Sequence, residues 1–158
     1  MKIRPATSAD VPSFHALERQ SPEAAHWSEE DYQQKLSHSS TLCLVAEGSE
    51  ADNGNPTVAG FLLGQVAADE MEILNFALTS AGRRQGLGRM LLQEAFAQAA
   101  ARGVRRCWLE ARASNQAALL FYQSQSFAEL YRRQKYYSDP VEDAVVCSRT
   151  LEPPPGLS

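Results

Sequence analysis

Apolar residues recur along the chain with two periods, which predict alternating strands and helices. The clearest helical pattern is "GLGRMLLQEAFAQAAARG", where apolar residues return every three or four positions from Leu87 to Ala99 and Gly103 marks the expected helix end. β-rich runs flank it, "EMEILNFALT" before and "VRRCWLEAR" after. The first run is almost continuously apolar from Ile73 to Leu78, as expected of a strand covered on both faces, and Asn75 is its one polar interior residue.

The remaining segments predict shorter elements. "KIRPATSADVPSFHALERQ" predicts a short strand and then a helix capped by Ser8 or Asp10, and "HWSEEDYQQKL" predicts a short, exposed helix capped by Ser28. "TLCLVAE" and "TVAGFLLGQVA" flank the turn-forming "GSEADNGNP" and predict a hairpin with a loose loop. "SNQAALLFYQSQ" predicts a helix capped at Ser114 or Asn115, and "FAELYRRQKYY" and "EDAVVCSRTL" predict a final strand pair.

This order of elements predicts an α/β fold, a mixed central sheet with helices on both faces. The chain has 158 residues, of which 44% are hydrophobic, which suits one domain with one core. We therefore expect a single domain over residues 1–150. The tail "EPPPGLS", within residues 151–158, is expected to be disordered.

Charge and hydropathy limit the partners. The formal net charge of -4 disfavours a general nucleic-acid binder, which needs a basic surface. No apolar run is long enough for a bilayer span, and "MKIRPATSAD" lacks the apolar stretch of a secretory signal, so we expect no membrane association and a cytoplasmic location.

The metal-ligating residue types are scattered. Cys43, Cys107 and Cys147 are widely separated and each lies among apolar residues, so we expect buried free thiols. No histidine pairs with a second ligand at metal-site spacing. The sequence therefore predicts no metal site.

The segment "RRQGLGRMLL" places Arg83–Gly88 between a strand and the start of a helix. Free backbone N–H groups at a helix N-terminus bind anions, and glycines let phosphate oxygens approach the backbone, so a phosphate-bearing ligand is predicted. The spacing excludes two known phosphate loops: "GLG" lacks the third glycine of a dinucleotide fingerprint, and no Gly-Lys-Ser/Thr is present. Taken alone, the loop is also compatible with a plain glycine turn.

Two further residues are candidates for chemistry. Alternation along "WLEAR" places Glu110 on one strand face with Trp108 and Arg112, where it either forms a structural ion pair with Arg112 or a lysine, or acts as a general base. Tyr122 follows in the next helix beside Phe121. Because neighbouring helical residues point about 100° apart, we expect one of these two rings to pack and the other to face a cleft.

The loop and these residues together resemble the GNAT superfamily of N-acetyltransferases, whose signature Arg/Gln-x-x-Gly-x-Gly/Ala matches "RRQGLG". Within it the chain looks like the bacterial ribosomal-protein-alanine N-acetyltransferases, through "WSEEDY", "NFAL", "WLEARASNQAALLFY" and "RRQKYYSDPVEDAVV". The resemblance implies one GNAT-like domain with a mostly antiparallel mixed sheet. It also implies an acetyl-CoA co-substrate and an acceptor protein N-terminus, that of a small-subunit ribosomal protein with N-terminal alanine. We expect a monomer or weak dimer.

The resemblance also assigns residue roles. Glu110 matches the proton acceptor and Tyr122 the proton donor. The positions that match contacts to acetyl-CoA are Phe76, Ala77, Leu78, Arg83, Arg84, Gln85, Gly86, Leu87, Gly88, Arg89 and Asn115. The candidates for the acceptor groove are Trp27, Asn75, Tyr136 and Tyr137.

These roles agree with the chemistry of amide formation. A protein α-amine, with a pKa of about 8, must lose a proton before it attacks a thioester, and Glu110 is placed to take it. A backbone N–H at a distorted point of the Asn75–Leu78 strand would stabilise the developing oxyanion, and Tyr122 would protonate the leaving thiolate. One departure from the family is Ser126, which stands where a glycine in a left-handed conformation usually ends the helix.

Two alternatives remain open from the sequence. A GNAT enzyme acting on a lysine side chain or a small amine would use the same residues, but lysine, with a pKa of about 10.4, is harder to deprotonate. A non-catalytic acyl-CoA sensor would keep the loop without needing Glu110 or Tyr122.

Overall fold

The computed structural model describes residues 2–21, 24–52 and 55–156, which form a seven-stranded sheet in the order β1-β2-β3-β4-β5-β7-β6. The strands are β1 (Lys2–Pro5), β2 (Thr41–Asp52), β3 (Asn55–Ala67), β4 (Glu70–Leu78), β5 (Arg106–Arg112), β6 (Ala128–Tyr137) and β7 (Glu142–Thr150). The helices are the 3-10 turn η1 (Ser8–Asp10), α1 (Val11–Gln20), α2 (Glu29–Ser37), α3 (Ser80–Arg84), α4 (Leu87–Ala101) and α5 (Gln116–Ser124). Among the strand pairs of the described residues, only β4–β5 is parallel.

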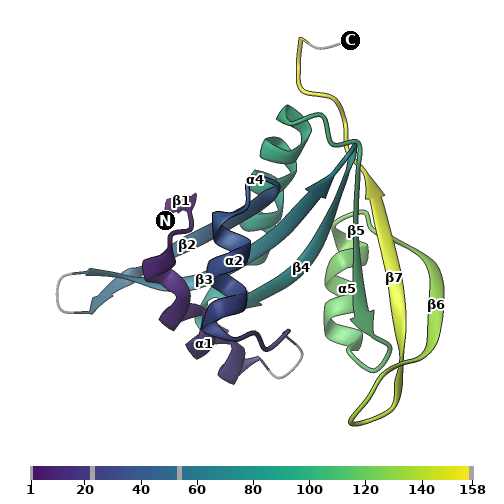
Figure 1. The fold of residues 1–158 in the computed structure, drawn as a ribbon, viewed down its shortest axis with the longest axis horizontal. Coiled ribbons are helices and arrows are strands. Elements are labelled where there is room, and N and C mark those ends of the chain that lie inside the picture. Colours follow the sequence, from purple (N-terminus) through teal and green to yellow (C-terminus); the bar gives the residue numbers. More distant parts are fainter. Residues whose placement is uncertain (1, 22–23, 53–54, 157–158) are drawn as a thin grey trace.

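Helices cover the two faces of the sheet in different places. The pair α1 and α2 lies over β2–β4 on one face, while α4 and α5 lie on the other face (Figure 1). Consequently β2–β4 are covered on both sides, which explains their nearly continuous apolar runs. On the α4 side the core includes Leu62 and Leu91, and on the α1 side it includes Phe14 and Phe61, whose rings stack at 4.1 Å. The predicted single α/β domain with a mixed, mostly antiparallel sheet is confirmed.

An irregularity in β4 changes which face its residues meet. Leu63 pairs with Asn75, but the next β3 residue, Gly64, pairs with Ile73, so Leu74 is an extra residue in β4. Ile73 therefore packs into the α4-side core, while Asn75 reaches Tyr32 on the other face. A continuous alternation would have placed Ile73 and Asn75 on the same face.

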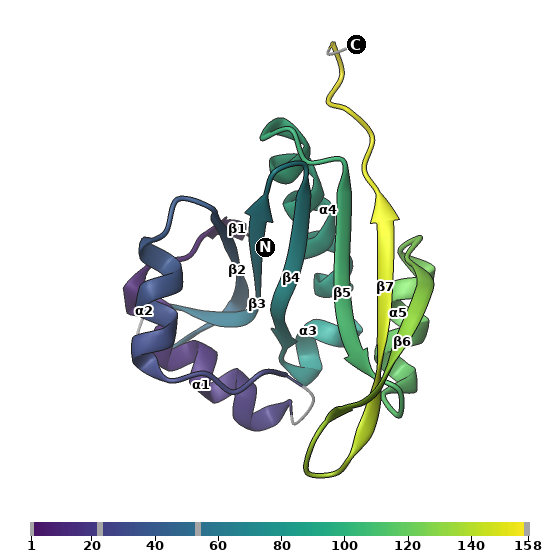
Figure 2. The same ribbon diagram turned by 45° about the vertical axis from the view of Figure 1, so that its right-hand side comes forward.

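The two halves of the sheet separate beyond the centre. β4 and β5 pair only from Glu70↔Arg106 to Glu72↔Trp108. After these pairs the strands diverge toward their carboxyl ends, as Figure 2 shows. The second half of each strand lines a cavity at this opening.

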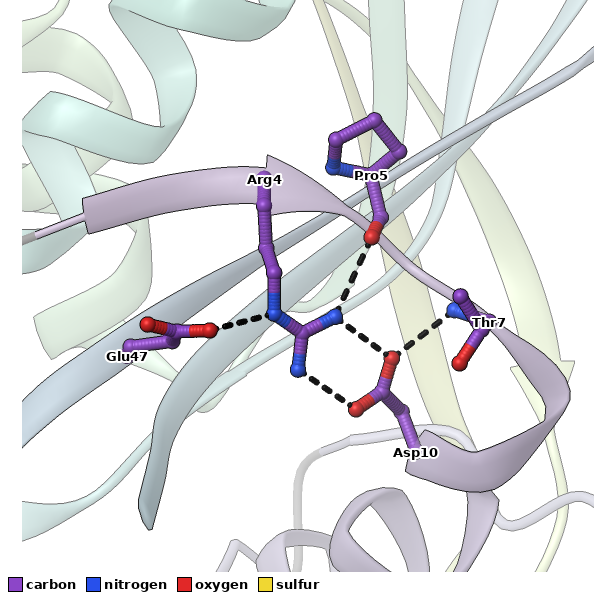
Figure 3. Close-up of polar contacts among 5 residues, drawn as sticks. All are labelled: Arg4, Pro5, Thr7, Asp10 and Glu47. Carbon is purple, nitrogen blue, oxygen red and sulfur yellow. Dashed lines mark hydrogen bonds and ion pairs between the residues drawn. The ribbon is translucent and has the colours of Figure 1, made fainter. Parts of the chain in front are cut away.

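The N-terminal strand is joined to its neighbours by an ionic network around Arg4 (Figure 3). The guanidinium donates to both carboxylate oxygens of Asp10, at 2.8 and 2.9 Å, and to Glu47 Oε1 at 2.6 Å. Asp10 also accepts the backbone N–H of Thr7 at 2.8 Å. The network thus holds β1, β2 and the start of α1 together.

Two helices begin with the expected side-chain caps. Ser28 Oγ accepts the N–H of Asp31 at 3.1 Å, and Asn115 Oδ1 accepts that of Ala118 at 3.2 Å. Asp10 stands at the N-cap position of α1, but its side chain makes no capping hydrogen bond. Ser126 has a φ of 69°, so it adopts the left-handed conformation that ends α5 without a glycine.

Three predictions differ from the structure. The loose hairpin loop is shorter than predicted, since β2 continues to Asp52 and β3 begins at Asn55; residues 53 and 54 lie outside the described residues. The predicted loop before α4 contains the short helix α3, which includes Arg83 and Arg84. The thiols of Cys107 and Cys147 are free and buried as expected, but Cys43 is only partly buried.

The tail forms neither helix nor strand over residues 151–156, and 157–158 lie outside the described residues. No helix in the part of the chain that the structure describes is long and apolar enough to cross a membrane. Nor do the described residues contain a group of three or more His, Cys, Asp or Glu side chains that could hold a metal ion.

Candidate active site

A cavity of about 410 Å³ occupies the opening between the diverging strands. One wall is the second half of β4, from Ile73 to Leu78, and the other is Leu109–Arg112 of β5. The first turn of α4, one side of α5 and the segment after α1 close it. The cavity therefore joins the predicted anion loop to both candidates for proton transfer.

The start of α4 supplies backbone donors to this cavity. The first N–H groups of a helix have no partner within the helix, and the helix dipole favours an anion beside them. Gly86, the N-cap, has a φ of 75°, a conformation that residues with a Cβ rarely adopt. A Cβ at Gly88 would lie 3.0 Å from Leu78 Cδ1 and 3.1 Å from Phe121 Cζ, so any larger residue would require these side chains to shift.

The predicted contacts to acetyl-CoA divide into two groups around this turn. Arg83, Gly86, Gly88 and Arg89 line the cavity, and Arg83 Nη2 donates to Ser21 Oγ at 3.0 Å. Arg84 and Gln85 are exposed and do not line it, while the side chain of Leu87 is fully buried in the core. The structure thus brings four of the seven predicted loop residues to the cavity, and Arg84, Gln85 and Leu87 are not among its lining residues.

The β4 wall presents main-chain groups. Phe76, Ala77 and Leu78 all line the cavity, as does Asn115 at the start of α5. The N–H of Thr79 donates to Ala59 O of β3 at 2.8 Å. Because successive amides along a strand point to opposite edges, the amide of Leu78 points away from β3, toward the opening. The amide of Phe76 is bonded to Asn75 Oδ1 at 3.0 Å.

Glu110 lines the cavity but is held by a residue that the sequence did not indicate. Its Oε1 lies 3.0 Å from Arg133 Nε on β6, and its side chain is 13% exposed. The predicted structural partner was wrong, because Arg112 pairs instead with Glu142 at 3.3 Å. The charge of the Glu110 carboxylate also raises the pKa of Tyr136 above its ordinary value.

Tyr122 lies on α5, facing the cavity from the side opposite to α1. Its ring packs 5.6 Å from that of Phe127 and 6.4 Å from that of Phe76. Burial raises the pKa of Tyr122 well above its ordinary value, so the phenol keeps its proton at neutral pH. The expectation that only one of Phe121 and Tyr122 faces the cleft was wrong, because both line the cavity.

The four acceptor-groove candidates have different surroundings. Asn75 lines the cavity, but its Nδ2 is used by Tyr32 Oη at 2.9 Å and Ala25 O at 3.2 Å. Tyr137 lines it with the guanidinium of Arg112 at 4.4 Å over its ring.

The other two candidates lie outside the cavity lining. The ring of Trp27 packs 5.3 Å from that of Tyr32, and the backbone N–H of Trp27 donates to Glu18 Oε1 at 3.0 Å. Tyr136 is 51% exposed, and the charge of Glu110 raises its pKa.

Sequence reasoning missed three parts of the site. The segment after α1 lines the cavity with Ser21, Ala24 and Ala25. The sequence signal for this was the run of small residues in "SPEAA", which allows a ligand to approach the backbone closely. Arg133 lies within the quoted "RRQKYY" without a predicted role. Glu72 alternates with apolar residues of β4, and burial followed by the charge of Glu110 raises its pKa.

Comparisons with known proteins agree with this geometry. The acetyltransferase (GNAT) family model matches residues 10–127. The ribosomal protein bS18-alanine N-acetyltransferase of Escherichia coli strain K12 is 35% identical over 141 residues, covering 88% of this chain and 90% of that protein. Its counterpart from Haemophilus influenzae is 36% identical over 95 residues, covering 58% and 64%.

Solved structures show the same fold. The ribosomal-protein-S18-alanine N-acetyltransferase from Escherichia coli superposes with a TM-score of 0.79 at 31% identity, covering 99% of this chain and 98% of that one. Arabidopsis thaliana NAA60 in complex with acetyl-CoA has a TM-score of 0.81, covering 94% and 97%, and at 17% identity it shows the fold alone. The chain belongs to the acetyltransferase (GNAT) family.

Proposed function

We propose that the protein transfers the acetyl group of acetyl-CoA to the α-amine of an N-terminal alanine, on a small-subunit ribosomal protein. The observation that carries the proposal is one cavity that joins Glu110, Tyr122 and the start of α4. Support for the acceptor comes from the Escherichia coli relative, which is named for ribosomal protein bS18 and alanine. Because ribosomal proteins are made in the cytoplasm, the proposal also places the protein there.

The residues at the start of α4 suit the pyrophosphate of coenzyme A. Unpaired helix-start amides, the left-handed Gly86 and the cavity-lining guanidinium groups of Arg83 and Arg89 together make an anion site. The apolar wall of Phe76, Ala77 and Leu78 suits the pantetheine arm. Acetyl-CoA supplies the activated thioester, and every other requirement falls to side chains and amides of this chain.

Proton transfer at the amine is assigned to Glu110. An N-terminal ammonium has a pKa of about 8, so a carboxylate within direct or water-mediated reach removes its proton before attack. The amide of Leu78, which points toward the opening, is the candidate donor for the negative charge that develops on the thioester oxygen. The carboxylate and this amide lie on opposite walls of the cavity.

Protonation of the leaving thiolate is assigned to Tyr122. Because burial raises its pKa, the phenol is fully protonated at neutral pH and has a proton to donate. Its place on α5, opposite the β4 wall, puts it on the cavity rather than on the outer surface.

The acceptor is tested with purified protein, acetyl-CoA and a panel of peptides. We expect release of free CoA thiol with a peptide that begins with alanine, and mass spectrometry should place the acetyl group on the α-amine. Acetylation confined to lysine side chains would contradict the proposed acceptor. Binding of acetyl-CoA without turnover on any amine would indicate a sensor instead.

The proton donor is tested with Tyr122→Phe. This change removes the hydroxyl and keeps the ring, so the packing against Phe76 and Phe127 is preserved. We expect kcat to fall about 100-fold, the lower range for a general acid, while the Kd for acetyl-CoA changes less than twofold. An unchanged kcat would remove Tyr122 from this role.

A further inference from the structure

The ion pair between Glu110 and Arg133 spans three strands on a part of the sheet face that none of the described helices covers (Figure 2). In β5, Cys107 and Leu109 point to the core beneath α4, so Glu110 points to the other face. Glu110 is opposite Val146 of β7, and Arg133 is opposite Ala144 of the same strand. The guanidinium therefore reaches across β7 to the rim of the cavity.

The partners of this pair have unequal freedom. The side chain of Arg133 is 43% exposed and that of Glu110 is 13% exposed. Apart from Glu110, the contacts of Arg133 with other described residues are weak: Tyr131 Oη lies 3.4 Å from Nη2, and the rings of Tyr131 and Tyr136 lie 5.8 and 5.5 Å from its guanidinium carbon. Arg133 can therefore move into solvent at small cost, while Glu110 stays in the cavity.

An acceptor amine needs the same carboxylate. The N-terminal ammonium is a cation at neutral pH, and it must come within reach of Glu110 to lose its proton. Glu72 lies nearby on β4, and its pKa is raised by burial and by the charge of Glu110, with Arg133 and Lys35 opposing the shift. Because Arg133 Nε already lies 3.0 Å from Glu110 Oε1, the guanidinium and the acceptor ammonium would compete for this carboxylate.

We propose that Arg133 is a positioning residue that occupies the place of the acceptor ammonium at Glu110 until the acceptor displaces it. The inference rests on the proposed function, because it takes Glu110 as the base for an N-terminal amine. After acetyl transfer the new amide carries no charge, so Arg133 can return to Glu110. The pair thus weakens binding of the amine and favours release of the product.

The test uses Arg133→Gln, with Arg132→Gln as the matched control. Arg132 is the neighbouring residue of β6, and it pairs with Glu129 at 2.7 Å with both side chains about half exposed. Steady-state kinetics give the acceptor KM and the acetyl-CoA KM separately. Binding is also measured for two unreactive peptides of the same sequence, one N-terminally acetylated and one N-terminally trimethylated, which differ in the charge at the N-terminus.

We expect Arg133→Gln to lower the acceptor KM about two- to fivefold, the size expected for removing competition from an exposed ion pair. The trimethylated peptide should bind more tightly by the same factor, while binding of the acetylated peptide and the acetyl-CoA KM stay constant. Arg133→Lys, which keeps a cation, should return the acceptor KM toward the wild-type value. Arg132→Gln should change none of these quantities.

Three results would overturn the inference: an unchanged acceptor KM, a raised one, or equal tightening of the charged and neutral peptides. A purely structural role for Arg133 would alter binding of both peptides alike. If the wild-type protein acetylates no N-terminal peptide, the proposed function fails instead. The two binding measurements do not need turnover, so they still report whether Arg133 competes with an N-terminal cation.

Discussion

Removing one buried hydroxyl should destabilise the whole wall on the α1 side of the site. Tyr32 of α2 is fully buried, and its Oη donates to Glu18 Oε1 at 2.6 Å and accepts from Asn75 Nδ2 at 2.9 Å. Tyr32→Phe keeps the ring but leaves both partners without this hydroxyl. The two groups are buried, so water cannot replace the lost contacts cheaply.

The magnitude follows from these two bonds. A hydrogen bond to a charged group contributes about 1.5–3 kcal/mol, and a buried amide that loses a partner adds to the cost, so we expect a loss of about 2–3 kcal/mol. For a chain of this size that corresponds to a fall in Tm of about 5–10 °C. Because no new surface is exposed in the native state, the slope of the urea transition should stay constant while its midpoint falls.

The assay is urea denaturation followed by tryptophan fluorescence and far-UV circular dichroism. Tyr131→Phe is the matched control, because Tyr131 is half exposed and its hydroxyl lies 3.4 Å from Arg133. The control should lose less than about 0.5 kcal/mol. If Tyr32→Phe loses no more than this, the buried network does not stabilise the fold as argued.

Two further changes test the loop and the N-terminal network. Gly86→Ala places a Cβ in open space at a φ of 75°, so backbone strain alone should lower the free energy of unfolding, measured by urea denaturation, by about 1–2 kcal/mol. Gly86→Asn should lower it less, because asparagine tolerates this conformation. Equal losses in the two variants would contradict the strain argument. Burial raises the pKa of Asp10, but the hydrogen bonds from Arg4 and Thr7 outweigh it, so the pKa is lowered (Figure 3). Arg4→Met removes the guanidinium from this network. The stabilisation from Asp10 is full above the ordinary aspartate pKa of about 4 and is lost as pH falls through the lowered folded value. The variant should therefore be about 1–2 kcal/mol less stable at pH 7 and lose less stability than the wild type on acidification. Parallel curves of unfolding free energy against pH for the two proteins would refute this account.

Local patterns were enough to predict most of the elements and their ends. The side-chain caps at Ser28 and Asn115, the long helix from Leu87 and the left-handed Ser126 depend on neighbouring residues only. These interactions lie within a few positions along the chain, so they can be recognised in a sequence. The same holds for the anion loop, whose glycines and helix start are contiguous.

The assembly of the site depends on contacts between distant segments, which local patterns do not encode. The extra residue at Leu74 turns Asn75 toward Tyr32, and the pairing of β4 with β5 ends at Glu72↔Trp108. Sequence alternation placed Glu110 on its strand face correctly, but it could not identify Arg133, two strands away, as its partner.

By itself, then, the sequence determined the α/β order of elements, most helix ends and the glycine-containing turn into α4, because each follows from residues close together in the chain. Only the tertiary structure decided that β4 and β5 diverge, that Glu110 and Tyr122 line one cavity, and that Arg133 covers the carboxylate. The physical reason is that strand register and divergence are set by packing on both faces of the sheet at once.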